Sequence, residues 1–367
     1  MNFNFFAPTK IFFGENKFLE IGEILRKNFF KKIGKNSPKI LICCGKNSAR
    51  KNGFLEILEK NLPGKIYFFE KIPPNPPVEF AENALEIARQ KNVDAIGAIG
   101  GGSAIDTAKI VATAFSNNCE IREIFAPNFS PQKKCAPFFV IPTTPATSSE
   151  INQFSVLTFK NRKKIFAHEK TIPDVAIIDP NLIFSLPKIE KISAVADIFA
   201  HSIESFWNKN SNFLTQFFAE KSIKILFKNA EKFVAGDQKI CREISLVSIL
   251  AGLAFGATGT TICHSISYFF TENFGVRHGI AAAATTGFFA EFFAQNSDQK
   301  KLLKIFDAEN PPAARKKIEN FLEKIGAAKN IFKLKIPKIS PKNLEKINFK
   351  NEKNPVKIDA KILAQLF

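Results

Sequence analysis

Histidine, tryptophan, tyrosine and methionine are scarce in this chain, whereas phenylalanine and lysine are abundant. Its 367 residues include four His, one Trp, two Tyr and one Met, against 41 Phe. Lys occurs beside Asn, Ile and Phe along the whole sequence, a pattern typical of a coding sequence rich in A and T. The formal net charge of +18 is therefore spread out and forms no basic stripe interleaved with aromatic residues. We expect no nucleic-acid partner.

Cysteine pairs and long apolar runs are also missing. The six cysteines show no C-x-x-C spacing, and a chain of this length does not need disulfide staples, so we expect reduced thiols. No run approaches the ~20 apolar residues of a membrane span. The opening MNFNFFAPTKIFFGEN lacks the basic, apolar and small-residue pattern of a secretory signal. We expect a cytoplasmic protein with no membrane partner.

Short apolar runs alternate with helical patterns in the first half of the chain. Strands are expected at 11–14, 39–44, 65–69, 93–99, 138–141, 156–157 and 175–178. Helices are expected between them at 16–29, 54–61 and 79–91. This alternation predicts a parallel sheet covered on both faces, which is a doubly wound α/β fold.

Strand signals fade after residue 189, and apolar periodicity of the helical kind takes over. Helices are expected at 195–207, 213–233, 240–255, 264–274, 280–293, 300–306 and 313–325. A Lys-rich tail follows from Lys329 and ends in a short helix near Lys361. We place the boundary between an α/β domain and an all-helical domain near Phe184.

The strand expected at 93–99 runs directly into a glycine-rich segment, GGGSAIDTAK, at residues 100–109. Three glycines let the backbone turn tightly and approach a ligand, and the following helix offers N–H groups to a phosphate. Ser103 and Asp106 match the S-x-x-D signature of a helix cap. A capped helix without a ligand is the alternative. The spacing is not G-x-G-x-x-G, so the dinucleotide fingerprint is matched only in part.

A second polar segment, PTTPATSSE at residues 142–150, follows the strand expected at 138–141. Hydroxyl groups beyond the carboxyl end of a strand lie where open α/β sheets bind ligands. A polar loop whose hydroxyls bond their own backbone is the alternative.

Three of the four histidines lie in candidate ligand positions. Asp197 and His201 are four residues apart in an expected helix, so their side chains share one face. A carboxylate and a neutral imidazole can both donate electron pairs to a divalent metal. His264 and His278 lie together in one later segment. A surface pair or a helix cap is the alternative for Asp197 and His201.

Taken in order, these motifs resemble the iron-containing alcohol dehydrogenase family. The matching segments are PTKIFFG (8–14), GGGSAIDTAK (100–109), PTTPATSSE (142–150), PDVAIIDP (173–180), DIFAHSIES (197–205) and HSISYFFTENFGVRHG (264–279). The resemblance covers nearly the whole chain. It implies a dinucleotide-binding α/β domain at 1–184 and a helical, metal-binding catalytic domain at 185–367, in the two-domain plan that dehydroquinate synthase shares.

The resemblance also implies a set of site residues. The metal ligands would be Asp197, His201, His264 and His278. The cofactor would contact Gly101, Gly102, Ser103, Asp106, Thr143, Thr144 and Thr147, with Asn75 and Lys164 at matching positions nearby. Fe²⁺ is the metal expected from the family, and Zn²⁺ accepts the same ligands.

The loop after Cys44 bears on the choice of cofactor. An NAD enzyme usually places a carboxylate there to bond the ribose 2′-hydroxyl, and that carboxylate repels a 2′-phosphate. This chain has Gly45 at that position, and Lys46, Ser48, Arg50 and Lys51 follow. We therefore predict NADP(H) in preference to NAD(H), with Gly45 and Ser48 among the cofactor-binding residues.

The chain departs from the family pattern at several positions. Ala146 and Ser148 stand where glycine is usual. Many members carry a proton-relaying His four residues after the third metal ligand, and here that residue is Tyr268. Tyrosine can donate a proton, although its ordinary pKa of ~10 makes it a poorer shuttle near neutral pH. We assign Tyr268 as the candidate relay.

The resemblance implies an alcohol dehydrogenase working chiefly as a reductase of a small aldehyde, and a homodimer or larger assembly. Tyr268 and the segment ESFWNKNSN at 204–212 are similar to the branch that includes phosphonoacetaldehyde reductases, for which Lys209 and Arg277 are candidate cationic groups. A lyase resembling dehydroquinate synthase is the alternative of another reaction class, but its metal-ligand pattern differs. A non-catalytic binding protein would require loss of a metal ligand, and none is lost.

Overall fold

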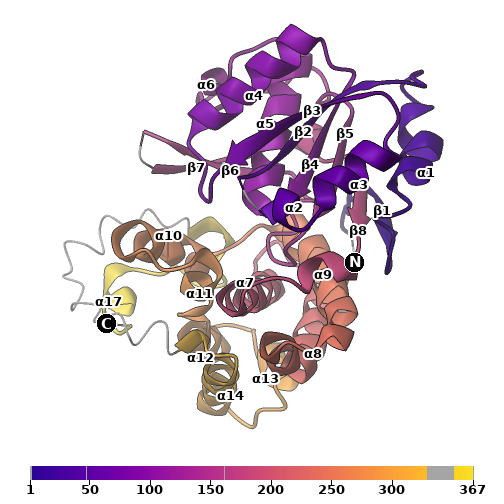
Figure 1. Ribbon diagram of the computed structural model, residues 1–367. Helices are drawn as coiled ribbons and strands as arrows, with labels where there is room; N and C mark the ends of the chain where they lie inside the picture. The colour runs from indigo at the N-terminus through magenta and orange to yellow at the C-terminus, as the bar shows by residue number, and fades with distance from the viewer. Residues whose placement is uncertain (1, 47, 161, 329–350, 367) are drawn as a thin grey trace. The chain divides into compact units, whose positions relative to one another are not determined.

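The computed structural model describes residues 2–46, 48–160, 162–328 and 351–366. The chain divides into two compact units (Figure 1). The α/β unit comprises Ala7–Phe184, and the helical unit comprises Ser185–Phe367 together with Met1–Phe6. The predicted fold class, an α/β domain followed by an all-helical domain, is confirmed.

The α/β unit is built on a six-stranded parallel sheet with the order β1-β8-β5-β4-β2-β3. The strands are β1 (Lys10–Phe13), β2 (Lys39–Gly45), β3 (Lys65–Ile72), β4 (Ala95–Gly100), β5 (Phe138–Pro142) and β8 (Val175–Ile178). β4, β5 and β8 are buried along their whole length because helices cover both faces, which is why their sequences are continuous apolar runs. The chain proceeds outward from β2 to β3 and then crosses back to β4, so β2 and β4 flank a topological switch point.

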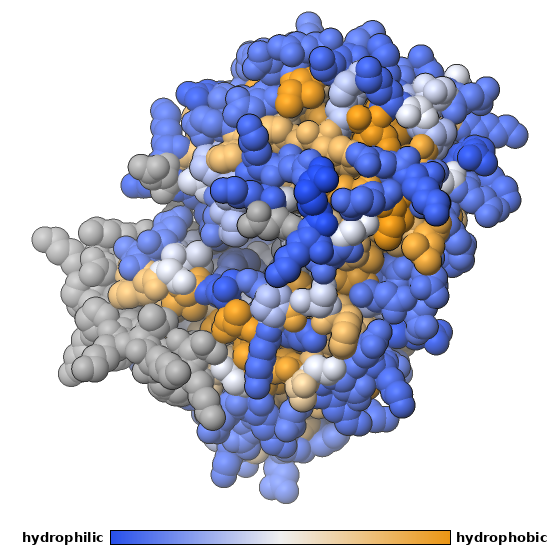
Figure 2. All heavy atoms as spheres, in the orientation of Figure 1, coloured by the Kyte–Doolittle hydropathy of each residue, from blue (hydrophilic) through white to orange (hydrophobic). Residues whose placement is uncertain are grey.

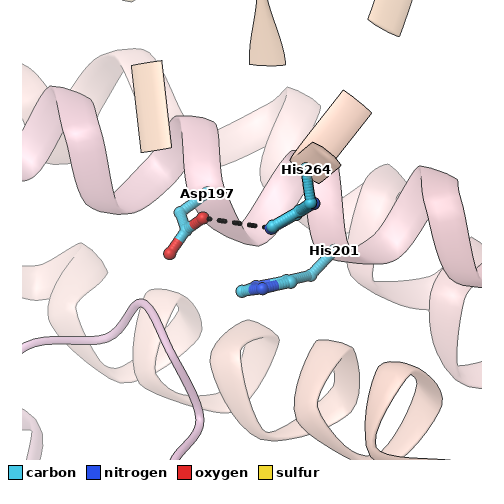
Figure 3. A group of neighbouring side chains, drawn as sticks. All are labelled: Asp197, His201 and His264. Carbon is cyan, nitrogen blue, oxygen red and sulfur yellow. Dashed lines mark ion pairs between the residues drawn. The ribbon is translucent and has the colours of Figure 1, made fainter. Parts of the chain in front are cut away.

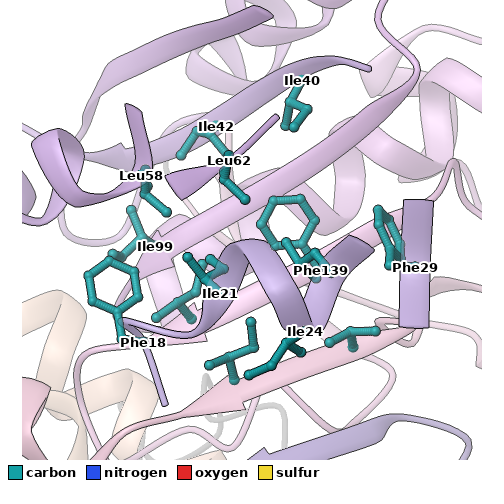
Figure 4. Packing of buried hydrophobic residues seen from close by; sticks show 14 of the residues in the cluster. Phe18, Ile21, Ile24, Phe29, Ile40, Ile42, Leu58, Leu62, Ile99 and Phe139 are labelled. Atoms are coloured by element: carbon teal, nitrogen blue, oxygen red, sulfur yellow. The ribbon is translucent and has the colours of Figure 1, made fainter. Parts of the chain in front are cut away.

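Different helices cover the two faces of this sheet. α1 (Ile21–Leu25), with a π-helical turn at Arg26–Phe30, and α3 (Phe54–Asn61) pack on one face. Figure 4 shows this core, in which Phe18, Phe29 and Leu58 meet side chains of the strands. The other face is covered by α4 (Val78–Lys91) and α5 (Gly102–Asn117). The expected helix at 16–29 is shorter and less regular than its periodicity predicts.

A two-stranded antiparallel hairpin, β6 (Phe154–Phe159) and β7 (Arg162–Ala167), lies outside the main sheet. The sequence analysis predicts only a short strand at 156–157 and no strand at β7. The reason is visible in the burial of β7, where only Phe166 is buried and four of the six side chains are exposed. A strand so exposed shows no apolar alternation strong enough to detect.

The helical unit is arranged around α7 (Lys188–Trp207). Nearly every residue from Lys191 to Trp207 is buried, because α8, α9 and α11 pack around this helix. The other helices are α8 (Phe213–Ala235), α9 (Cys241–Thr258), α10 (Ile262–Phe274), α11 (His278–Ala283), α12 (Thr286–Asn296), α13 (Lys301–Ile305), α14 (Pro311–Lys324) and α17 (Ala360–Ala364). α17 matches the short helix expected near Lys361, whereas the part of the tail from 329 to 350 lies outside the described residues.

The single helix expected at 280–293 is two helices, α11 and α12. The helical backbone is interrupted at Thr285, and the Thr286 hydroxyl donates a hydrogen bond to the Ala283 carbonyl at 2.7 Å. Hydroxyl groups that bond nearby backbone compete with helical hydrogen bonding. The continuous apolar pattern of this segment hides that break.

One segment of the described chain, Gln238–Thr258, is long and apolar enough by composition to cross a membrane. More than half of its most apolar stretch is buried, where α9 packs against α7 and α8. The segment therefore serves as a core helix of its unit.

Hydrophilic side chains cover most of the face shown in Figure 2, and apolar side chains are exposed in patches between them.

Candidate metal and cofactor sites

Asp197 and His201 lie one turn apart on α7, and His264 reaches them from the first turn of α10. One ligand atom of each residue lies within 4.8 Å of the others, and all three residues are buried. Figure 3 shows the Asp197 carboxylate facing the His264 ring, with His201 beside them. The separation of Asp197 Oδ1 and His264 Nε2 is 3.6 Å, longer than a hydrogen bond.

These atoms fit a bound cation. Asp197 Oδ1 and His264 Nε2 are each buried without a hydrogen-bond partner in the described chain. Burial alone would raise the pKa of Asp197, but the neighbouring histidines, His201 foremost, hold it well below its usual range. Burial alone would lower the pKa of His264, but the Glu204 and Asp197 carboxylates raise it to about 9. The pocket therefore favours positive charge, which a divalent metal would supply.

His278, the fourth predicted ligand, begins α11, and its Nε2 lies 4.0 Å from Asp197 Oδ1. Its side chain is 29% exposed, so it forms the open side of the cluster. The next residue, Gly279, lies against α7. A Cβ atom at Gly279 would be 2.0 Å from the Ser193 carbonyl oxygen and 2.7 Å from Asp197 Cβ. Only glycine permits this approach of α11 to α7.

Aromatic rings fix the orientation of the imidazoles. Phe255 of α9 stacks on His201 with centroids 4.0 Å apart and an interplanar angle of 9°. His201 in turn stacks on His264 at 4.5 Å. The predicted relay, Tyr268, stacks on His278 at 5.7 Å and 8°. Tyr268 therefore lies beside the open side of the cluster, where a relay must be.

Glu204, whose side chain is completely buried, is not among the predicted site residues. Its Oε2 accepts a short hydrogen bond from His264 Nδ1. Burial alone would raise the pKa of Glu204, but His264 and the surrounding donors lower it, so it stays ionised. The sequence does contain a signal for Glu204, because Asp197, His201 and Glu204 are spaced i, i+4, i+7 and therefore share one helix face.

The predicted cofactor residues follow the carboxyl ends of three adjacent strands in the α/β unit. β2 pairs with β4 through Cys44 and Ile99, and β4 pairs with β5 through Gly100 and Pro142. Gly45 ends β2, Gly101–Ser103 follows β4, and the threonine-rich loop (143–150) follows β5. Ligands of open α/β sheets bind in such a crevice at a switch point.

Two glycines let the glycine-rich turn and the threonine-rich loop approach each other closely. A Cβ at Gly101 would lie 3.0 Å from Thr144 Oγ1, and one at Gly102 would lie 2.6 Å from Thr147 Cγ2. The Thr143 amide donates to the Gly100 carbonyl at 2.9 Å. α5 begins at Gly102, so the first N–H groups of this 16-residue helix have no acceptor within it. They are available to an anion.

Asp106 and Lys109 connect α5 to the threonine-rich loop. The Asp106 carboxylate accepts from Ser149 Oγ and, at 2.9 Å, from the Val156 amide. Lys109 is completely buried, and its Nζ donates to the carbonyls of Ser149, Asn152 and Phe154 at 2.7 to 2.9 Å. The capping prediction is wrong, because α5 has Gly101 at its N-cap and Ser103 lies inside the helix. Asp106 stabilises the loop and caps nothing.

The other predicted cofactor residues are more exposed. Ser48 begins the short helix α2 (Ser48–Lys51), and Arg50 within it pairs with both carboxylate oxygens of Glu70 on β3. Asn75 has a left-handed backbone, with φ of 50°, and its carbonyl accepts from the Thr158 hydroxyl. Lys164 is exposed on β7.

At Ser148, the departure from the family pattern concerns the backbone conformation. Ser148 has φ of 46°, in the left-handed region that glycine adopts without steric cost. Asn152 Nδ2 donates to its carbonyl at 2.7 Å and holds that conformation. Serine here therefore retains the turn that a glycine would form.

Comparison with known proteins identifies the family of the chain. Residues 8–180 match the family model described as iron-containing alcohol dehydrogenase. Residues 191–361 match the one described as Fe-containing alcohol dehydrogenase family, C-terminal. The two matches together span most of both units.

Individual relatives give the same result. The chain is 31% identical to NAD-dependent methanol dehydrogenase of Bacillus methanolicus, over 76% of this chain and 72% of that protein. NADH-dependent butanol dehydrogenase B of Clostridium acetobutylicum is 29% identical over 83% of this chain and 78% of its own. Sulfoacetaldehyde reductase from Bifidobacterium kashiwanohense, solved with NAD⁺, superposes with a TM-score of 0.90 at 26% identity, covering 100% of this chain and 98% of that one.

Gly279→Ala tests the close approach of α11 to α7. The added methyl group forces the helices apart, so we expect a loss of stability of about 1 to 3 kcal/mol and a metal affinity lower by about tenfold or more. Urea denaturation and Co²⁺ titration against a chromophoric chelator measure the two effects. Gly287→Ala on α12 is the matched control, because its Cβ would meet nothing nearer than 3.4 Å. Equal metal affinity in the two variants would contradict the role given to Gly279.

Proposed function

The chain belongs to the iron-containing alcohol dehydrogenase family, and we propose that it transfers hydride between NADP(H) and a small aldehyde or primary alcohol, chiefly as an aldehyde reductase. The observation that carries this proposal is the buried pair Asp197 Oδ1 and His264 Nε2, which face each other at 3.6 Å and have no hydrogen-bond partner among the described residues. Reductase chemistry needs a cation at such a point, because negative charge develops on the substrate oxygen as hydride arrives.

Asp197, His201, His264 and His278 hold the metal in this proposal. A divalent metal supplies there a Lewis acid that stabilises negative charge on the carbonyl oxygen. Fe²⁺ is the metal that the family description names, and Zn²⁺ suits the same donor set. The partly exposed side chain of His278 leaves room for a substrate on that side of the cluster. On the other side, Phe255 covers one face of the His201 ring.

The cofactor residues have separate tasks. NADP(H) supplies or accepts the hydride. The N–H groups of Gly102 and Ser103 at the start of α5 bind its pyrophosphate, and Thr143, Thr144 and Thr147 line the groove beside it. Asp106 and Lys109 stabilise the loop that carries these threonines through their hydrogen bonds with Ser149. Catalysis then requires the nicotinamide to reach the carbonyl carbon at contact distance, about 3 to 3.5 Å.

The preference for NADP(H) rests on Gly45. The relatives described above carry NAD⁺ or NADH in their names, so this part of the proposal departs from them. No carboxylate follows β2 here, and Lys46, Ser48 and Lys51 are exposed around the turn. Arg50 is already held by Glu70, which leaves the two lysines and the Ser48 hydroxyl for a 2′-phosphate.

The substrate is a small aldehyde. The likeness to sulfoacetaldehyde reductase favours a second candidate, a two-carbon aldehyde with an anionic head such as phosphonoacetaldehyde. Of the cations proposed for such a head, Arg277 already pairs with Glu190 and Lys209 is exposed. These contacts favour an uncharged aldehyde. Family membership favours hydride transfer over lyase chemistry, and a homodimer or larger assembly remains a prediction.

NADPH oxidation with short-chain aldehydes, phosphonoacetaldehyde included, tests the proposed activity directly. Protein prepared without oxygen is assayed with Fe²⁺, with Zn²⁺ and with a chelator. We expect turnover that requires metal and is lost in His264→Ala but kept in His168→Ala, because the His168 ring lies in the α/β unit, where its Nδ1 accepts from the Lys170 amide. The absence of turnover in folded, metal-loaded protein would contradict the proposal.

Gly45→Asp tests the cofactor preference. The new carboxylate repels the 2′-phosphate and bonds a 2′-hydroxyl, so the ratio of kcat/KM for NADPH over NADH should fall by about tenfold or more. The turn tolerates the side chain, because the nearest atom to a Cβ there is 3.6 Å away. Asn83→Asp, which adds the same charge to the exposed face of α4, should leave the ratio unchanged. A ratio that already favours NADH in the unmodified protein would overturn this preference.

Tyr268→Phe tests the proton relay. Phenylalanine keeps the ring that stacks on His278 and removes only the hydroxyl. If the hydroxyl delivers the proton, kcat for aldehyde reduction falls by about 100-fold, while metal affinity stays the same and the pH profile of kcat changes. Unchanged kcat and pH profile would remove Tyr268 from the mechanism.

A further inference from the structure

The buried carboxylate of Glu204 makes two separate sets of hydrogen bonds, one through each oxygen. Its Oε1 accepts four hydrogen bonds, from the amides of Thr261, Cys263 and His264 at 3.1, 2.8 and 3.3 Å and from the Thr261 hydroxyl at 2.6 Å. These amides are the unpaired donors at the start of α10. Its Oε2 accepts from the ring of His264. The helix that carries the third metal ligand is therefore capped by the group that holds that ligand's ring.

The contact at Oε2 fixes which ring nitrogen of His264 carries the proton. An ionised carboxylate has no hydrogen to donate, so the proton in this contact belongs to His264 Nδ1. In the neutral ring the other nitrogen, Nε2, then has a free electron pair. Nε2 is the atom that faces Asp197 Oδ1 at 3.6 Å. When the ring is neutral, as a metal ligand must be, its electron pair therefore points toward the site of the cation.

Glu204 also balances charge. Three neutral imidazoles and the Asp197 carboxylate would leave a divalent metal site with a net charge of +1 in a buried place. The Glu204 carboxylate, which is completely buried and in contact with one ligand, brings the local sum to zero. Neutrality reduces the desolvation penalty of burying the charges.

We propose that Glu204 is the positioning residue of the metal site: by capping α10 and accepting from His264 Nδ1, it sets the tautomer in which His264 Nε2 binds the metal. This inference rests on the proposed function, because it assumes that the cluster binds a divalent metal. Glu204 itself touches neither metal nor substrate.

Glu204→Gln separates the two tasks. An amide offers one oxygen and one NH₂ group, and the four donors at the Oε1 position select the oxygen. The NH₂ group then faces His264 Nδ1, which must accept, so the ring proton moves to Nε2 and blocks the metal. We expect a folded protein whose affinity for Co²⁺ is about 10 to 100-fold weaker, with an altered visible absorption of the bound Co²⁺. Competition with a chromophoric chelator measures the affinity, and circular dichroism measures the fold.

Two controls make the result specific. Glu190→Gln makes the same change on the same helix, at an exposed carboxylate that pairs with Arg277 next to His278, and should leave Co²⁺ affinity unchanged. Thr261→Val removes one donor from Oε1 and the acceptor of Trp207 Nε1 but keeps the contact with His264 Nδ1. It should lower the melting temperature without weakening metal binding.

The outcomes distinguish this inference from the proposed function. If the unmodified protein binds no Co²⁺, the metal site itself is absent and both fail. If it binds Co²⁺ and a folded Glu204→Gln variant binds as tightly, only the role of Glu204 is overturned. Should that variant not fold, ¹⁵N-histidine spectra of the unmodified Zn²⁺-loaded protein decide. A protonated Nδ1 on His264 supports the inference, and an unprotonated Nδ1 overturns it.

Discussion

A carboxylate oxygen and an imidazole nitrogen, both buried and facing each other at 3.6 Å, are the constraint on which the helical unit depends. Leaving such buried polar atoms without a partner costs free energy, and a cation between them would satisfy both. The surrounding residues hold these two atoms in position. α7 is enclosed by other helices, Phe255 and the stacked rings hold the histidines, and Gly279 lets α11 approach closely enough to add His278. Glu204 contributes to the same arrangement in the role inferred above, because it orients the His264 ring.

In the α/β unit the main constraint is the close approach of loops that follow the carboxyl ends of adjacent strands. Parallel strands place three loops at one edge, and Gly101 and Gly102 allow two of them to touch. The buried Lys109 then ties the threonine-rich loop to α5 through three backbone carbonyls. Burial lowers the pKa of Lys109 to about 8, and the neighbouring Asp106 and Glu150 side chains oppose that shift. The conformation of the threonine-rich loop thus depends on buried residues of α5.

Periodicity and motif order were sufficient to predict the fold class, most elements and the common face of Asp197 and His201. They failed where the decisive contact joins residues distant in the chain. The spacing of Glu204 from Asp197 and His201 places it on their helix face, but its partners lie on α10, 57 to 60 residues away, and the spacing does not identify them. Asp106 has the spacing of a cap, but its partners Ser149 and Val156 lie more than 40 residues on. β7 was missed because its side chains face outward, and the break between α11 and α12 because its hydroxyls sit in an apolar run.

The central claim is that the helical unit holds a divalent metal between Asp197, His201, His264 and His278. A crystal of the full chain grown with Co²⁺ and measured at the cobalt absorption edge tests it most directly. We expect one strong anomalous peak bonded to Asp197 and to His264 through Nε2, with Nδ1 still hydrogen-bonded to Glu204. A peak elsewhere, or a fully occupied metal site bonded through His264 Nδ1, would contradict it.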